Sequence, residues 1–258
     1  MFLAKMAEAG LFKKIVESIK DIVTVVNFDI SGAGISFQAM DVSHVALVSL
    51  LITSDAFTEY RADRKTTIGV KLLNLHKILK CADNADMITL ECDQEDPQVL
   101  NVKFESHKQD KSSKFVLNLV VQDEEQLQLP DTVYAAKITM PAAEFTRIVR
   151  EMSQLSENIA IRASKRTVNF EVKGDVTTGD IELKANNSDR MADYIGIEAE
   201  EGVRNSFALS FLNSFCKASC LSEQVTMSMS ANTPIVVDYR IQNSGYLRFY
   251  LAPKIEGD

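Results

Sequence analysis

The stretch "FKKIV", residues 12–16, returns 133 residues later as "FTRIV", residues 145–149. At the same offset, "ISF" at 35–37 corresponds to "VNF" at 168–170. Further along the chain the offset becomes 137, and "ITL" at 88–90 corresponds to "VTM" at 225–227. One insertion of four residues accounts for the change, and we place it in the polar stretch "ANNSDR", residues 185–190. A collinear series with a single shift predicts two copies of one domain.

Each copy is predicted to contain two helices separated by short strands. Residues 10–21 form the first helix, in which apolar residues recur at helical spacing on one side: Leu11, Phe12, Ile15, Val16 and Ile19. We expect the second helix at residues 72–82 in the first copy and 209–219 in the second. The stretches between them alternate apolar and polar residues, and their connections are too short for repeated parallel crossovers. The sequence therefore predicts an α+β fold with mostly antiparallel sheet.

A linker is predicted between the two copies. Residues 120–135 contain an acidic run and a proline, and they show no helical or strand period. We therefore expect an N-terminal domain at residues 1–118, a linker at 119–134 and a C-terminal domain at 135–258. Leu127, Leu129 and Pro130 are apolar residues in this exposed stretch, which makes them candidates for contact with a partner.

The composition is that of a globular protein. Of the 258 residues, 46% are hydrophobic and 25% are charged, and the net charge is -8. No apolar run is long enough to span a membrane, and the first ten residues lack the apolar core of a signal peptide. The four cysteines form no CxxC pair, so we expect buried free thiols in a reducing compartment. Cys216 and Cys220 lack a second ligand pair, and neither a metal nor a cofactor is expected.

Basic residues recur on the polar sides of the predicted helices in both copies. For a single helix, solubility would be a sufficient explanation. Recurrence favours a shared role, and Lys and Arg without interleaved aromatic residues suit the phosphates of a duplex rather than a stacked single strand. A solvated face and a phosphate-binding face both stay open at this point. The residues are Lys13, Lys14, Lys20, Lys77, Lys80, Arg147, Arg150 and Lys217.

Catalysis is not expected, although one stretch contains the residue types of a catalytic triad. Asp41, Ser43 and His44 lie within four positions, and near neighbours on a strand or loop seldom converge side chain to side chain. The glycines of "SGAG", residues 31–34, join two strands, so no helix N-terminus follows them to bind phosphate.

Four motifs are specific enough to indicate a family: "MDVSHV" at 40–45, "KILKCA" at 77–82, "EQL" at 125–127 with Pro130, and "YLAPKI" at 250–255. With these motifs the chain resembles the proliferating cell nuclear antigen family, the eukaryotic DNA sliding clamps, from end to end. The resemblance implies two tandem DNA-clamp domains in a closed homotrimeric ring, with sheets outside and helices lining a hole for duplex DNA. Twelve helices packed about 9–10 Å apart leave a hole roughly 25 Å wide, whereas the eight helices of two chains leave too little room.

The resemblance also implies a function and its sites. The chain would be a nuclear, non-enzymatic processivity factor for DNA replication and repair, and the eight basic residues would face the DNA. DNA polymerases, a flap nuclease, a ligase and the clamp loader would dock through short helical peptide motifs. Neighbouring chains would pair the strands near 111–119 and 177–184. Lys165 would be the ubiquitin acceptor. The peptide pocket would use Met40, His44, Leu127, Leu129, Pro130, Pro234, Tyr250, Leu251, Ala252, Pro253, Lys254 and Ile255.

Some residues depart from the family pattern, and two other functions stay open. Residues 127–130 read "LQLP", without the glycine usual in the family, and the acidic-glycine pair usual after the acceptor lysine is missing after Lys165. The first alternative is a stand-alone protein-interaction scaffold that never contacts DNA. The second is a hydrolase that uses Ser43 and His44.

Overall fold

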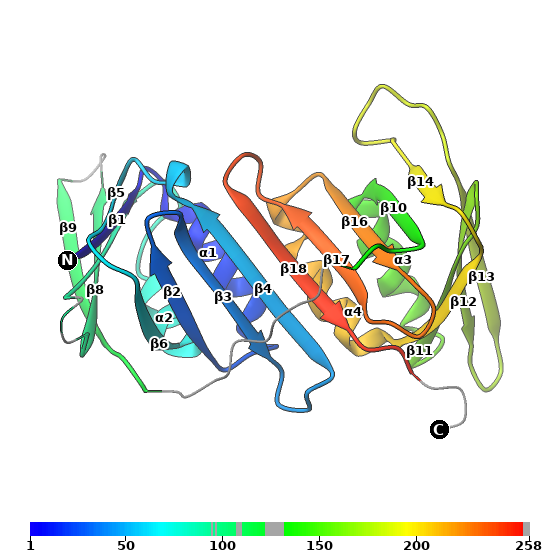
Figure 1. Ribbon diagram of the computed structural model, residues 1–258, viewed down its shortest axis with the longest axis horizontal. Helices are drawn as coiled ribbons and strands as arrows, with labels where there is room; N and C mark the ends of the chain where they lie inside the picture. Colours follow the sequence, from blue (N-terminus) through cyan, green and yellow to red (C-terminus); the bar gives the residue numbers. More distant parts are fainter. Residues whose placement is uncertain (94, 96, 107–109, 122–131, 255–258) are drawn as a thin grey trace. The chain divides into compact units, whose positions relative to one another are not determined.

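The computed structural model describes residues 1–93, 95, 97–106, 110–121 and 132–254 (Figure 1). The chain divides into two compact units. Unit 1 contains Met1–Val42, Val48–Leu127 and Ile241–Leu247, and unit 2 contains Ser43–Leu47, Gln128–Arg240 and Arg248–Asp258. The predicted linker at 119–134 lies largely outside the described residues, so its bounds stay a prediction.

Unit 1 is built from antiparallel strands and two α-helices. Its strands form the orders β5-β1-β7-β8-β9 and β4-β3-β2-β6. Adjacent strands such as β7 and β8 pair antiparallel. The elements are β1 (Phe2–Met6), α1 (Ala9–Ile19), β2 (Val25–Ser31), β3 (Gly34–Met40), β4 (Ala46–Thr53), β5 (Glu59–Ala62), β6 (Thr66–Lys71), α2 (Leu72–Leu79), β7 (Met87–Cys92), β8 (Val99–Ser106) and β9 (Lys111–Asn118).

Unit 2 repeats this architecture. Its strands form the orders β14-β10-β16-β17-β18 and β13-β12-β11-β15, again with antiparallel pairs. The elements are β10 (Ala136–Pro141), α3 (Ala142–Met152), β11 (Asn158–Ala163), β12 (Thr167–Lys173), β13 (Thr178–Lys184), β14 (Gly196–Ala199), β15 (Val203–Ala208), α4 (Leu209–Phe215), β16 (Gln224–Met229), β17 (Ile235–Arg240) and β18 (Gly245–Leu251).

The element order of the two units confirms the internal repeat. Strand β1 corresponds to β10, helix α1 to α3, and so on to β9 and β18, and corresponding strands hold corresponding places in their sheets. The connection that differs most is residues 54–58 between β4 and β5, against residues 185–195 between β13 and β14. The longer connection contains the stretch "ANNSDR" to which we assigned the insertion.

The helices form because each buries one apolar side against its own unit. Phe12, Ile15 and Val16 of α1 are at most 2% exposed, and Phe145 and Ile148 of α3 are fully buried. Burial of such a stripe supplies most of the stability of a helix this short. The second helices are shorter than predicted, because α2 ends at Leu79 and α4 continues past Phe215 as a 3₁₀-helix, Cys216–Leu221.

Each helix pair is fixed by backbone hydrogen bonds at the helix N-termini. In unit 1 the first N–H of α1, at Ala9, donates to the carbonyl of Asp86, and the Leu72 N–H of α2 donates to Thr24. In unit 2 the Ala142 N–H of α3 donates to Glu223, and the Leu209 N–H of α4 donates to Glu157. In each unit, a carbonyl in the turn after one helix therefore accepts from the first free N–H of the other helix. The side chains at the four N-cap positions make no capping hydrogen bond. This reciprocal capping sets the position of the exposed helix faces.

The expectation that all four thiols are buried is wrong. Cys92 and Cys216 are buried, whereas Cys81 and Cys220 are exposed, and all four are free. Cys81 lies two residues after the end of α2, and Cys220 lies in the 3₁₀-helix that follows α4.

Residues 119 and 120, the first of the predicted linker, are attached to unit 1. The Leu119 N–H donates to Gln98, and the Val120 N–H donates to the Gly69 carbonyl at 2.9 Å. A β-carbon on Gly69 would lie 2.0 Å from the Val120 oxygen, so this close approach requires glycine.

Candidate nucleic-acid interface and partner surface

The predicted basic residues all lie on or directly after the four helices. Lys13 and Lys14 belong to α1, with Lys20 just after it, and Lys77 belongs to α2, with Lys80 just after it. Arg147 and Arg150 belong to α3, and Lys217 lies in the 3₁₀-helix that continues α4. Most are exposed, but Lys13 and Lys20 are half-buried.

The cations of α1 are partly engaged within unit 1. The Lys13 ammonium donates to the Ala82 carbonyl at 2.5 Å, at the end of the α2 segment. The Lys20 Nζ lies 3.0 Å from a carboxylate oxygen of Asp21 and 3.4 Å from Glu17 Oε1. Its hydrogen bond to Asp21 is the main reason why the pKa of Lys20 is raised, and Glu17 adds to the effect. Lys14 is exposed and makes no ion pair among the described residues.

The two arginines of α3 differ in their ion pairing. The guanidinium of Arg147 lies between two carboxylates, 2.6 Å from Glu144 Oε1 and 3.0 Å from Glu151 Oε1. The hydrogen bonds from Arg147 lower the pKa of Glu144. Arg150, three residues further on, is exposed and has no ion pair within the part of the chain that the structure describes.

Four of the predicted cations therefore have no competing carboxylate in the described ranges: Lys14, Lys77, Lys80 and Arg150. Such groups can neutralise phosphates, and they carry no base-specific readout. The sequence did not separate them from the engaged cations. The spacing of Glu144, Arg147 and Glu151 at three and four residues does predict the pairs on α3, whereas the contacts between α1 and α2 could not be read from local spacing.

The predicted partner residues are described only in part. Leu127, Leu129, Pro130 and Ile255 lie outside the described residues. Met40, at the end of β3 in unit 1, is half-buried. In unit 2, His44 and Pro234 are exposed, and Tyr250, Ala252 and Pro253 are half-buried.

Two backbone hydrogen bonds hold the end of the described chain to unit 2. The Ala252 N–H donates to the Val45 carbonyl at 3.1 Å, and the Lys254 N–H donates to Ser206 at 2.8 Å. Leu251 is fully buried, so its side chain offers no surface to a partner, in contrast to the prediction. Sequence reasoning did not point to Tyr134, which interacts electrostatically with Tyr250 and Arg248. Burial is the main reason why the pKa of Tyr134 is raised.

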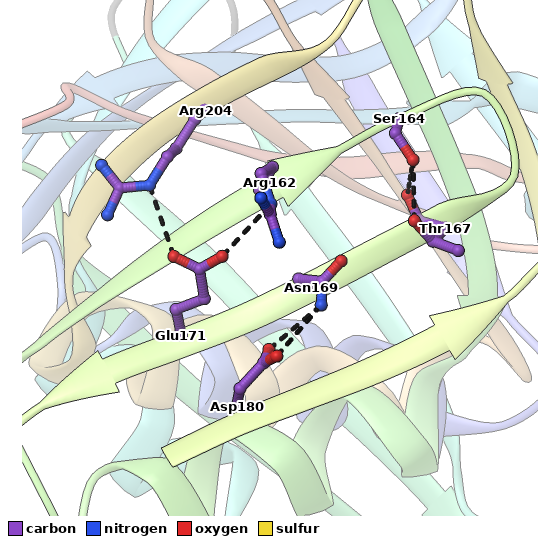
Figure 2. Close-up of polar contacts among 7 residues, drawn as sticks. All are labelled: Arg162, Ser164, Thr167, Asn169, Glu171, Asp180 and Arg204. Atoms are coloured by element: carbon purple, nitrogen blue, oxygen red, sulfur yellow. Dashed lines mark hydrogen bonds and ion pairs between the residues drawn. The ribbon is translucent and has the colours of Figure 1, made fainter. Parts of the chain in front are cut away.

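Lys165 lies on a tight hairpin between β11 and β12. The Ser164 N–H donates to the Thr167 carbonyl at 2.8 Å, and the two hydroxyls are 2.7 Å apart, so the two residues between them form the turn. Lys165 is exposed. Figure 2 shows this closure at one end of the sheet and, further along it, Glu171 between two guanidiniums. Glu171 lies 3.2 Å from Arg162 Nε and 3.4 Å from Arg204 Nε. The hairpin thus closes one end of a sheet whose exposed face carries the ion pairs of Glu171 with Arg162 and Arg204.

Two further observations concern the described residues as a set. None of their helices is both long and apolar enough to cross a membrane. No group of three or more His, Cys, Asp or Glu side chains among them could hold a metal ion.

Comparisons with known proteins agree across the whole chain. The family model described as proliferating cell nuclear antigen, N-terminal domain, matches residues 1–127, and the C-terminal domain model matches residues 128–254. A curated relative named proliferating cell nuclear antigen, from Chaetomium thermophilum, is 44% identical over 259 residues, which cover 100% of both chains. Two tandem domains of this kind define a DNA sliding clamp, a processivity factor and not an enzyme. The chain belongs to the proliferating cell nuclear antigen family.

Proposed function

We propose that three copies of this chain close into a ring around duplex DNA, with the four helices of each chain facing the phosphates. The observation that carries the proposal is the recurrence of one capped helix pair in both units, each with exposed cations that no carboxylate among the described residues engages. Contacts to phosphate alone hold DNA without regard to sequence, which permits sliding. The net charge of -8 would disfavour DNA on the outer surfaces.

Two edge strands support the ring. Strand β9 lies at one edge of β5-β1-β7-β8-β9, and β13 lies at one edge of β13-β12-β11-β15. Exposed lysines on β9, Lys111 and Lys114, complement exposed carboxylates on β13, Asp180 and Glu182. Pairing β9 of one chain with β13 of the next is a head-to-tail contact, which generates a closed ring when the rotation allows. It also covers two strand edges that would otherwise promote aggregation.

The second part of the proposal is a docking platform on unit 2 and the segment predicted as a linker. Partners such as polymerases, a flap nuclease, a ligase and the clamp loader would insert a short helical turn against His44, Pro234, Tyr250 and Ala252. The backbone near residues 253–255 would add hydrogen bonds, as in strand addition. The N–H groups of Ala252 and Lys254 are already donated within unit 2, so the carbonyls of this stretch would accept from the partner. The protein would also be ubiquitinated at Lys165 and located in the nucleus. The exposure of Lys165 on its hairpin supports ubiquitination at this residue.

The solution mass tests the ring most simply. Light scattering should give the mass of three chains of 28.7 kDa each. A monomer cannot encircle DNA, so a monomeric mass over the working concentration range would leave only the stand-alone scaffold. For the docking platform, a peptide with two aromatic residues in a helical turn should bind the native chain. Ala252→Asp should abolish that binding, whereas Val176→Asp, at an exposed turn of unit 2, should not.

A further inference from the structure

A carboxylate of α1 contacts an imidazole of α2 on the basic side of unit 1. Glu17 Oε2 lies 3.1 Å from His76 Nδ1, while Glu17 Oε1 lies 3.4 Å from Lys20 Nζ. The side chain of His76 is only 12% exposed, whereas that of Glu17 is 54% exposed. The imidazole therefore sits between the two helices and anchors a carboxylate whose other oxygen engages a cation.

Four charged groups of the described chain act on the His76 imidazole. Glu17, Lys20 and Asp21 come from α1 and the residues after it, and Lys80 comes from the end of α2 itself. Among the described residues, β6 and β9, the other elements packed against α2, add no charge to this set. Burial is the main reason why the pKa of His76 is lowered, and Lys80 and Lys20 lower it further, whereas Glu17 and Asp21 raise it. At neutral pH the imidazole is uncharged, and its Nδ1 lies beside the Glu17 carboxylate.

The repeat shows that unit 2 lacks this arrangement. At the offset of 133, Glu17 corresponds to Arg150, and at the offset of 137, His76 corresponds to Asn213. Within the described ranges, unit 2 therefore presents a cation without an ion pair where unit 1 presents a carboxylate bound by a titratable side chain. The two helix pairs share their backbone and differ in charge at this place.

We propose that Glu17 and His76 form a proton-sensitive contact that sets how strongly the helices of unit 1 hold the DNA backbone. With His76 neutral, the two carboxylates of the group balance Lys20 and Lys80, and the group has no net charge. Protonation of His76 adds one positive charge to this group, and the group then attracts phosphate. Glu17 acts as a positioning residue, since it holds Lys20 away from phosphate and orients His76.

The contact itself is tested without DNA, by NMR titration of the His76 imidazole in the full-length protein. The chain has only three histidines, so His76→Asn assigns the signal. Glu17→Gln should lower the His76 pKa, because it removes the group that favours the charged form, and Lys80→Gln should raise it. The proposal would be overturned if the pKa of His76 were the same in Glu17→Gln, in Lys80→Gln and in the wild type.

The effect on DNA rests on the proposed function and is measured separately, as retention on circular duplex DNA. Glu17→Gln should increase affinity about two- to fivefold at low salt, the size expected for one exposed ion pair. Between about pH 8 and about pH 5.5, the wild type should gain more affinity than His76→Asn. Equal gains in both proteins would overturn the proton-sensitive role. If the wild type is not retained at all, the ring proposal fails, and the assignment of the DNA contact fails with it, while the titration still reports on the contact.

Discussion

At the residue scale, the basic side chains of the four helices fall into two groups. Lys13, Lys20 and Arg147 are engaged by a carbonyl or by carboxylates of their own unit. Lys14, Lys77, Lys80 and Arg150 have no such partner among the described residues. An engaged cation must give up its partner before it can bind phosphate, so the cations without a partner should carry most of the salt-dependent binding.

Arg150 is the clearest test of this division. Arg150→Gln should weaken retention on circular DNA, and the slope of log affinity against log salt should fall by about 0.9 for each phosphate that the variant no longer neutralises. Arg240→Gln, which removes an exposed arginine of β17 that pairs with Asp238, is the matched control and should leave the slope unchanged. Equal slopes for all three proteins would mean that α3 does not touch DNA.

The thiols give a second test at this scale. Burial raises the pKa of Cys216 to about 12 and that of Cys92 to about 11, so neither forms appreciable thiolate at neutral pH. Cys81 and Cys220 are exposed. A thiol reagent at neutral pH should therefore label two cysteines in the native protein and four after denaturation, and peptide mapping should place the two early labels at 81 and 220. Rapid labelling of Cys216 would contradict the packing around α4.

At the element scale, the helices could be predicted but their connections could not. The apolar spacing of Leu11, Phe12 and Ile15 predicts α1 closely, because burial of that stripe is a local pattern. The reciprocal capping by Asp86, Thr24 and their counterparts depends on turns that are distant in sequence, and backbone carbonyls leave no residue-type signal. The contact of Glu17 with His76 was not predicted either, because the two side chains come from helices that are distant in the sequence.

The edge strands supply a prediction for this scale. Val116 of β9 is 58% exposed on a strand that we assign to the contact between chains. Val116→Asp should convert the trimer to monomers, because the new carboxylate would lose its water at that contact and would face a strand that carries Asp180 and Glu182. The far-ultraviolet circular dichroism spectrum of the folded chain should change little, since the side chain is exposed within the chain. Light scattering and circular dichroism measure the two quantities.

Val42 offers the matched control for that experiment. It is 87% exposed and lies after β3, away from both edge strands in sequence. Val42→Asp should leave the mass of the assembly unchanged. If both Val116→Asp and Val42→Asp leave the protein trimeric, β9 does not form the contact between chains.

At the scale of the whole molecule, the repeat was the most informative part of the sequence. Two offsets, 133 and 137, predicted that both units share one order of elements, and they predicted the site of the insertion. The strands that precede the first helix of each unit, β1 and β10, were not predicted. Composition could not predict which cations are engaged, nor that Leu251 is buried beside the half-buried Tyr250 and Ala252. Those features depend on which side chains the sheets bring together, and no local pattern encodes them.

We propose above that the chain holds DNA by encircling it. Retention after dilution should be compared on closed circular duplex DNA and on the same DNA cut once, after loading by a clamp-loading ATPase. A ring should stay on the circle and slide off the free ends of the linear form, and blocking those ends should restore retention. Equal retention on circular and open linear DNA would contradict the account, because a protein that binds phosphates from one side does not sense the ends.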